Sequence, residues 1–415
     1  MTYITSGETL YAAPSQTTAS RIVSLRGAPS SAKGIFLALL GIEGGALRVR
    51  TPDDQVLHFG PQEAPTADLN IRDYRFAARV AAGGDIGFAD GWMAGEWTSP
   101  DLAALLTLLS ANAERVMRYL QGGFFARLLT QVSHARRNNT RSGSRRNILA
   151  HYDLGNAFFE SWLDPSMTYS SARFDRASDL AGAQQQKYAA LAERLQLMPG
   201  ATVLEIGCGW GGFAEYAARE HGARVTAITI SDQQFQYAQT RIAKAGLTDK
   251  VEIRRQDYRD VQGQFDAVAS IEMIEAVGED YWPVYFGKIA GVLKPGGRAA
   301  IQAITIRDDL FESYRRRTDF IQHYIFPGGM LPSIAQLNSH AAKAGLTWLG
   351  AEGFAHSYAR TLAEWARRFQ ASWAIIQQHG FDERFRRLWL FYLAYCEAGF
   401  RTGRTDVIQL ALGKS

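Results

Sequence analysis

The stretch Val203-Leu-Glu-Ile-Gly-Cys-Gly-Trp-Gly-Gly212 decides the fold of this chain. It reads as an apolar strand that ends in a glycine-rich turn, and the turn opens a helix. In a parallel sheet, such a strand delivers its last residues to the edge where ligands bind. Glycine is required there because a Cβ would block both the backbone dihedrals of the turn and the close approach of a ligand. The stretch therefore predicts a loop that binds a nucleotide cofactor.

Two features of this loop favour S-adenosylmethionine over NAD. Gly207, Gly209 and Gly212 also fit the dinucleotide-binding spacing, which is weak evidence by itself. However, Glu205 stands just before the first glycine, where its carboxylate can receive the ammonium group of an amino-acid moiety. The next strand, 225–230, lacks the terminal acid that would bind ribose hydroxyls in an NAD site. A purely structural glycine turn is the third alternative.

The catalytic region alternates between helix and strand from about residue 150. Pro199-Gly200 and Pro295-Gly296 mark turns before two of the strands. The expected strands are 202–206, 224–230, 251–255, 265–270 and 297–304, and the expected helices are 181–195, 213–221, 232–245 and 279–293. This alternation predicts an α/β fold with a doubly wound, mainly parallel sheet.

The chain is long enough for more than one domain. We expect residues 1–120 to form a small α+β domain. Residues 121–149 are expected to form a helix followed by an arginine-rich linker. Residues 150–415 then form the catalytic domain. Within the first domain we expect strands at 47–49, 56–59 and 69–71, and helices at 74–82 and 102–120.

Composition limits the protein class and the compartment. With 47% hydrophobic and 21% charged residues, the chain resembles an ordinary globular protein. Its two cysteines are too few for a disulfide framework, which favours a reducing compartment. We expect no secretory signal, and the apolar run 388–400 is shorter than the ~20 residues that a membrane span requires. The expected location is cytoplasmic, peripheral at the inner face of the membrane.

Five arginines without an intervening acid lie between residues 134 and 147. They are Arg136, Arg137, Arg141, Arg145 and Arg146. One interpretation is a solvated linker. The other is a strip that faces phosphates, either of anionic lipid headgroups or of a nucleic-acid backbone.

Seven motifs in a fixed order narrow the family. They are His151-Tyr-Asp-Leu-Gly-Asn156, Trp162-Leu-Asp-Pro-Ser-Met-Thr-Tyr-Ser-Ser-Ala172, the glycine loop, Thr229-Ile-Ser-Asp-Gln-Gln234, Gln256-Asp-Tyr-Arg-Asp260, Ile271-Glu-Met-Ile-Glu-Ala-Val-Gly278 and Tyr324-Ile-Phe-Pro-Gly-Gly329. Together they resemble the cyclopropane-fatty-acyl-phospholipid synthase family, and the mycolic acid cyclopropane synthases and methyltransferases share the set. The resemblance covers about residue 150 to the C-terminus and extends to the small N-terminal domain. It implies a class I S-adenosylmethionine-dependent methyltransferase with a Rossmann-like sheet.

The resemblance also implies which residues bind S-adenosylmethionine. Besides Glu205, these are Tyr169, Ser170, Gly207, Gly209, Thr229, Ile230, Gln234, Asp257 and Tyr258. This set agrees with a ligand crevice at the strand carboxyl ends and the helix N-terminus. Without the resemblance, Thr229 and Gln234 are better explained by helix capping and solvation.

Family members add a methyl group to a cis double bond and then remove a proton with a bound bicarbonate. In the family this anion is bound by a Cys, a Glu, a His and a Tyr. Glu275 and Tyr358 match the glutamate and the tyrosine, but Ser171 stands at the cysteine position and Gln302 at the histidine position. Serine and glutamine can still donate hydrogen bonds to an oxyanion. The departure puts the basicity of the site, and bicarbonate itself, in question.

The acyl cation also needs stabilisation and the exclusion of water. The faces of Tyr169, Phe174, Tyr324 and Tyr358 are candidates for this role, and ordinary core packing is the alternative for each of them.

The sequence thus predicts a methyltransferase that acts on unsaturated acyl chains of membrane phospholipids. Cyclopropane formation is the leading outcome, and a methyl-branched or methylene-bearing product is the second. We expect no metal, no nucleic-acid partner and peripheral contact with an anionic membrane, and leave a homodimer open. The other function classes are a nucleic-acid methyltransferase, which lacks an Asn-Pro-Pro-Tyr signature here, and a non-catalytic lipid-binding protein.

Overall fold

The computed structural model describes residues 16–61, 66–116 and 154–415. The chain forms two compact units, Met1–Val132 and Ser133–Ser415. The predicted domain boundaries at residues 120 and 150 lie outside the described residues and stay predictions. The arginine strip and the first three residues of the His151–Asn156 motif lie outside them as well.

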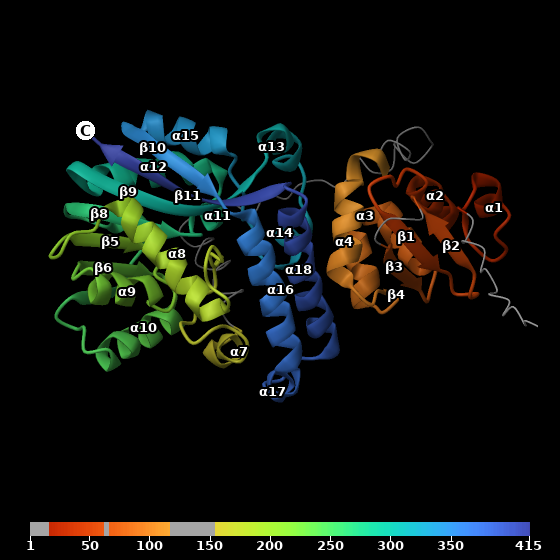
Figure 1. Cartoon of the computed structure of the whole chain (residues 1–415), viewed down its shortest axis with the longest axis horizontal. Coiled ribbons are helices and arrows are strands. Elements are labelled where there is room, and N and C mark those ends of the chain that lie inside the picture. Colours follow the sequence, from red (N-terminus) through yellow and green to blue (C-terminus); the bar gives the residue numbers. More distant parts are fainter. Residues whose placement is uncertain (1–15, 62–65, 117–153) are drawn as a thin grey trace, which may run out of the picture. The chain divides into compact units, whose positions relative to one another are not determined.

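The first unit combines a small sheet with helices, as the sequence predicts (Figure 1). Its strands pair in the order β2-β1-β3-β4. The strands are β1 (Ala46–Arg50), β2 (Val56–Phe59), β3 (Thr66–Ile71) and β4 (Trp97–Thr98), and the helices are α1 (Ala19–Val23), α2 (Ser30–Leu39), α3 (Arg75–Met93) and α4 (Leu102–Ala111). The expected helix 102–120 is interrupted: α4 ends at Ala111, a turn follows at Asn112, residues 113–116 are helical again, and residues 117–120 lie outside the described residues.

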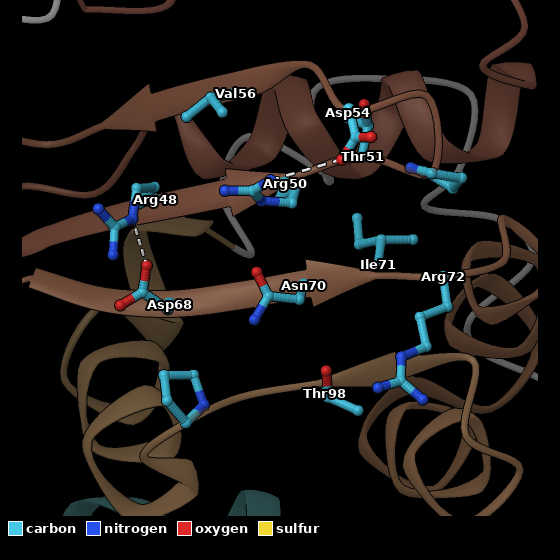
Figure 2. A pocket seen from close by; sticks show the side chains of 12 residues that line it. Arg48, Arg50, Thr51, Asp54, Val56, Asp68, Asn70, Ile71, Arg72 and Thr98 are labelled. Atoms are coloured by element: carbon cyan, nitrogen blue, oxygen red, sulfur yellow. Dashed lines mark hydrogen bonds and ion pairs between the residues drawn. The ribbon is translucent and has the colours of Figure 1, made fainter.

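A pocket on this sheet is lined by charged side chains from β1 and its neighbours (Figure 2). Arg48 forms an ion pair with Asp68, and Arg50 pairs with Asp54 at 3.4 Å. None of the residues predicted for cofactor binding or catalysis lines this pocket. The residues predicted for cofactor binding and catalysis all belong to the second unit.

The second unit is built on a seven-stranded sheet in the order β10-β11-β9-β8-β5-β6-β7. Strand β11 runs antiparallel to both of its neighbours, and the remaining pairs are parallel. The strands are β5 (Thr202–Ile206), β6 (Arg224–Thr229), β7 (Val251–Arg255), β8 (Phe265–Ile271), β9 (Leu293–Ile306), β10 (Leu346–Gly353) and β11 (Thr405–Lys414). The predicted doubly wound fold is confirmed.

Helices cover both faces of this sheet (Figure 1). Helices α8 (Leu180–Leu195), α9 (Gly212–Glu220) and α10 (Asp232–Lys244) pack on one face, and α12 (Trp282–Val292) and α15 (Ile334–Lys343) on the other.

Each face of the sheet has its own hydrophobic core. Along β8, Ala267 and Ala269 join one core while Val268 joins the other, because successive strand side chains point to opposite faces. This two-sided burial explains the nearly continuous apolar runs of the parallel strands.

Further helices stand at the carboxyl edge of the parallel strands (Figure 1). They are α7 (Asn156–Glu160), α11 (Ile274–Val277), α13 (Asp308–Tyr314), α14 (Phe320–Tyr324), α16 (Ala355–Ala371), α17 (Trp373–Gln378) and α18 (Glu383–Arg401), with short 3₁₀ turns at Tyr258–Asp260 and Glu279–Tyr281. Helices α16 to α18 form the connection between β10 and β11. The sequence did not predict the elements after β9. Among the described residues, no helix has the length and apolar character needed to cross a bilayer.

Candidate active site

The carboxyl edge of the parallel strands gathers most of the predicted site residues. The glycine loop follows β5, Thr229 ends β6, Asp257 follows β7, and Ile271-Glu272 ends β8. These four strands are parallel neighbours, so their ends meet at one edge. The loop is folded against β6, because the N–H groups of Gly207 and Cys208 both donate to the Ile228 carbonyl at 3.0 and 2.9 Å.

The glycines of this loop serve two different purposes. Gly207 and Gly209 have φ angles of 80° and 52°, in the left-handed region that favours glycine. A Cβ at Gly207 would lie 2.9 Å from Met273 Cγ, so this position is needed for packing. A Cβ at Gly209 would meet nothing within 4 Å. The backbone at Gly209 thus borders open space, as a loop that cradles a ligand must.

Glu205 is a buried acid that has one unsatisfied oxygen. Glu205 is only 2% exposed to solvent. Its carboxylate oxygen Oε2 has no hydrogen-bond partner among the described residues. Burial raises the pKa of Glu205 to about 8, against the opposing effect of the Lys187 charge. An ammonium group placed here would satisfy the orphaned oxygen and favour the ionised acid. The residues present therefore fit the amino-acid end of S-adenosylmethionine.

Tyr169 and Ser170 lie against partners from distant parts of the chain. The Tyr169 hydroxyl shares a hydrogen bond of 2.8 Å with the Tyr392 hydroxyl of α18, and its ring lies 5.2 Å from that of Trp365. Lys187 Nζ donates to Ser170 Oγ at 2.8 Å. Burial lowers the pKa of Lys187 to about 7, although nearby carboxylates favour its charge.

The polar groups predicted on the adenosine side already have protein partners. Thr229 Oγ1 donates to Gln234 Oε1 at 2.8 Å, and Ser231 is the N-cap of α10. Arg259 forms a bidentate ion pair with Asp257 and its guanidinium lies 5.6 Å from the Tyr258 ring. A ligand contact by these residues would therefore share or replace existing bonds. Ile230 is half-buried at the end of the same strand.

Three of the four residues predicted for the base site converge on a carboxylate that the sequence had not singled out, Glu272. Its Oε1 accepts from the Ser171 N–H at 2.8 Å and from Gln302 Nε2 at 2.7 Å, and its Oε2 accepts from the Tyr358 hydroxyl at 2.8 Å. Burial raises the pKa of Glu272, and the three donors together with the Lys187 charge oppose this shift.

The orientation of Gln302 follows from the acceptors around it. Gln302 Nε2 also donates to the Ser171 carbonyl at 3.2 Å, and a carbonyl can only accept. Gln409 of β11, the register partner of Gln302, donates to Gln302 Oε1 at 3.0 Å and to the Lys187 carbonyl at 3.1 Å. The amide of Gln302 therefore presents its NH₂ group, and not its oxygen, to Glu272.

Ser171 contributes its backbone and not its hydroxyl. The hydroxyl donates to the Ala172 carbonyl at 3.0 Å, whereas the N–H donates to Glu272. The expected side-chain donor at the cysteine position is thus replaced by a main-chain donor.

Glu275 makes no hydrogen bond to Ser171, Gln302 or Tyr358, the three residues that donate to Glu272, among the bonds that the described residues form. Glu275 accepts from the Ile304 N–H through Oε1, and its buried Oε2 has no partner among the described residues. Burial raises the pKa of Glu275 to about 8, and the charge of Glu272 contributes to the rise. Glu272 and Glu275 are neighbours with different surroundings, and the strand-end motif Ile271–Gly278 contains both acids. An acid directly after the strand was the signal in the sequence that could have identified Glu272.

The predicted aromatic candidates differ in their surroundings. Tyr358 stacks on Phe400 with ring centres 4.4 Å apart. One face of Phe174 is covered by the Arg360 guanidinium at 4.0 Å, which makes this ring less suited to a second cation. Trp210 of the glycine loop donates to Asn156 Oδ1 at 2.8 Å, and this bond connects the first and third sequence motifs.

Comparison with known proteins identifies the family of this chain. The family model described as mycolic acid cyclopropane synthetase matches residues 139–410. The tuberculostearic acid methyltransferase of Mycobacterium tuberculosis is 42% identical over 377 residues, which cover 88% of this chain and 87% of that protein. The cyclopropane-fatty-acyl-phospholipid synthase of Escherichia coli is 34% identical over 356 residues, which cover 84% of this chain and 88% of that protein.

Solved structures give the same assignment. A mycolic acid cyclopropane synthase complexed with SAH and CTAB superposes with a TM-score of 0.61 at 29% identity, covering 65% of this chain and 98% of that chain. A cyclopropane synthase from Mycobacterium tuberculosis gives 0.61 at 30% identity with the same coverage. The chain therefore belongs to the mycolic acid cyclopropane synthetase family and is one of its S-adenosylmethionine-dependent methyltransferases.

Proposed function

We propose that this enzyme methylates a carbon of the cis double bond in unsaturated acyl chains of membrane phospholipids. The observation that carries the proposal is a carboxylate, Glu272, held by three hydrogen-bond donors at the sheet edge that carries the glycine loop. Methylation of an alkene creates a cation that must lose a proton, so it needs such an acceptor. The named activities of the two relatives above, on fatty acids and phospholipids, support the same substrate class.

The residues that would hold S-adenosylmethionine are those predicted from the sequence. When bound, this cofactor supplies an electrophilic methyl group. The Glu205 carboxylate would receive the ammonium group, and the backbone at Gly207 and Gly209 would lie along the ligand. Tyr169 and Ser170 would close the site from the side of α16 and α18, while Thr229, Ile230, Gln234, Asp257 and Tyr258 would contact the adenosine part.

Two products can form from the methylated cation without an external reductant. If the new methyl loses a proton and its carbon closes on the cation, a cyclopropane forms. If a hydride shifts first to the neighbouring cationic carbon, loss of a proton from the new methyl gives a methylene group (C=CH₂) on the acyl chain. A saturated methyl branch would need a hydride donor in addition. The sequence alone ranks the cyclopropane first. We reverse this order and propose the methylene product, with the cyclopropane second, because of the changed base site and the higher identity to a relative named as a methyltransferase than to the named synthase.

Product analysis tests this function directly. We expect the protein, incubated with labelled S-adenosylmethionine and vesicles of a cis-monounsaturated phospholipid, to place label in the acyl chain. NMR of the released fatty acid separates a ring from its methylene isomer, which mass alone does not. Labelling of nucleic acid in place of lipid would refute the proposed substrate class, and a ring as sole product would favour the second candidate.

The glycine loop provides a test of the cofactor site. We expect Gly209→Val to abolish S-adenosylmethionine binding, because a β-branched side chain would fill the open space at this position and strain a φ of 52°. Isothermal calorimetry on the folded variant measures this. Gly200→Val is the matched control, because Gly200 has a φ of 81° and equally open space but precedes β5 at the opposite end of the strand. Equal affinity of the parent and the Gly209 variant would contradict the site.

We propose a different state for Glu275. Its side chain is a neutral acid beside the charged carboxylate of Glu272. With a pKa of about 8, it is mostly protonated at neutral pH. This arrangement avoids a second buried charge next to the first.

This assignment predicts a pH dependence of stability. An unfolded glutamic acid ionises above its ordinary pKa of about 4.3, whereas native Glu275 keeps its proton up to about pH 8. The native state therefore binds more protons in this window, and stability falls as pH rises through it, by at most ~1.4 kcal/mol per unit. We expect Glu275→Gln, which copies the neutral acid, to remove this part of the slope in urea denaturation between pH 5 and 8. Parallel slopes for parent and variant would show that Glu275 is ionised throughout.

We also propose that the arginine strip contacts an anionic membrane surface. Replacing Arg136, Arg137, Arg141, Arg145 and Arg146 by Gln should weaken binding to anionic vesicles, because each basic residue near such a surface contributes ~1 kcal/mol. Added salt should weaken binding of the parent, since screening shortens the reach of these charges. Co-sedimentation measures both, with Arg254→Gln/Arg255→Gln as a control. Binding that responds to neither change would leave the strip a linker.

A further inference from the structure

The side chain of Glu272 is held in the manner of a bound anion. Two of its three donors have fixed polarity, because a backbone N–H and an amide NH₂ can donate but never accept. They come from Ser171 and from Gln302, which Gln409 holds in its orientation. The third donor is the Tyr358 hydroxyl. A carboxylate oxygen pair accepts up to about four hydrogen bonds, and three are provided here from three separate segments of the chain.

The backbone at Glu272 is in a conformation that glycine would adopt more readily. Its φ is 49°, and it is one of four described residues other than glycine that have a positive φ. Such a conformation costs a side-chain-bearing residue free energy, and residues that adopt it cluster at functional sites. Glu272 follows β8 directly, and its N–H donates to the Gln302 carbonyl at 2.8 Å, which ties the strained residue to β9.

The donors around Glu272 occupy the positions that match the bicarbonate-binding cysteine, histidine and tyrosine of the family, with Ser171 and Gln302 as the two departures. We infer that the Glu272 carboxylate takes the place of the exogenous anion and is itself the proton acceptor of the reaction. This inference rests on the proposed function for the acceptor role, whereas the occupation of an anion site by Glu272 can be tested without it.

The proton balance of the step is simple. A C–H bond of the new methyl group on the cationic acyl chain breaks. Its electron pair forms either the carbon–carbon bond that closes the cyclopropane ring or, after the hydride shift, the second bond of the C=CH₂ group. The proton moves to a carboxylate oxygen of Glu272, which becomes a neutral acid. In each turnover this proton must leave to solvent before the next one arrives. No external base, oxidant or reductant takes part.

The experiment compares two substitutions that remove the carboxylate in different ways. Glu272→Gln keeps the size of the side chain but cannot accept the proton. Glu272→Gly removes the side chain, suits the φ of 49°, and leaves the three donors facing a space where a small anion can bind. Gln196→Gly is the matched backbone control, since Gln196 has a φ of 53° at the end of α8. Glu312→Gln, at an exposed site on α13, is the matched control for the change of charge.

Two readouts are used. The first is the melting temperature of each protein without cofactor, with bicarbonate or formate added and chloride as the control salt. An anion that binds only the folded protein raises its melting temperature. The second is turnover on cis-unsaturated phospholipid vesicles with the same anions, together with S-adenosylmethionine affinity by calorimetry.

We expect both Glu272 variants to lose ~10²- to 10⁴-fold in turnover, the range typical of general acid–base catalysis, with cofactor affinity changed less than about threefold. Bicarbonate or formate should raise the melting temperature of the glycine variant, but not of the parent, and should restore its turnover at least tenfold. The glutamine variant should show no rescue, because its side chain still fills the site. Both controls should behave as the parent does.

Three results would overturn the inference. Turnover of Glu272→Gln within threefold of the parent would exclude the acceptor role. A shift in melting temperature without restored turnover would show that Glu272 fills an anion site but does not take the proton. Absence of both shift and rescue in the glycine variant would refute the anion site itself. If the parent does not methylate lipid at all, the proposed function fails, and the melting temperatures alone then decide whether Glu272 replaces an anion.

Discussion

Burial of acidic side chains at the carboxyl edge of the sheet is the constraint on which the site depends. An isolated buried carboxylate is costly, so it must be paired, hydrogen-bonded or protonated. Glu272 meets this requirement through hydrogen bonds, whereas burial raises the pKa of Glu205 and of Glu275 to about 8. Glu205 keeps an unpartnered oxygen beside the glycine loop, Glu272 receives three donors, and Glu275 accepts one backbone N–H and has a pKa raised to about 8. From these differences we propose that the first binds the cofactor, the second accepts the proton and the third stays a neutral acid.

The polar site is completed by helices that lie far away in the sequence. Tyr358 reaches Glu272 from α16, and Tyr392 reaches Tyr169 from α18. Trp162, Trp365 and Trp389 are fully buried around this pair of helices. A tight aromatic packing of this kind excludes water, and water must be kept away from a cation on an acyl chain. The connection between β10 and β11 thus contacts the residues of the proposed site, through Tyr358 and Tyr392.

Sequence patterns predicted the central sheet with good accuracy because its signals are local. The run 202–206, the glycine loop and the following helix are where they were expected, as are the next two strands. Helix 279–293 appears as α12 after a short 3₁₀ turn, since Pro283 suits the first turn of a helix. The last strand and the helices before it were not predicted. Strand β11 pairs between β9 and β10 as the one antiparallel strand, and such pairing depends on partners that are distant in the sequence, such as Leu346 for Lys414 and Arg298 for Gly413.

The sequence by itself determined the fold class, the glycine loop, the cofactor class and the family, because each follows from residue types at short, fixed spacing. It also predicted that Ser171, Gln302 and Tyr358 act together. Only the tertiary structure decided what they act on. Spacing alone could not choose between Glu272 and Glu275, which lie three residues apart in one motif. In the structure Glu272 has a positive φ and its carboxylate meets donors from β9, α16 and the Tyr169–Ala172 segment, whereas Glu275 bonds to the backbone of Ile304. Contacts between segments this distant in sequence exist only once the chain has folded.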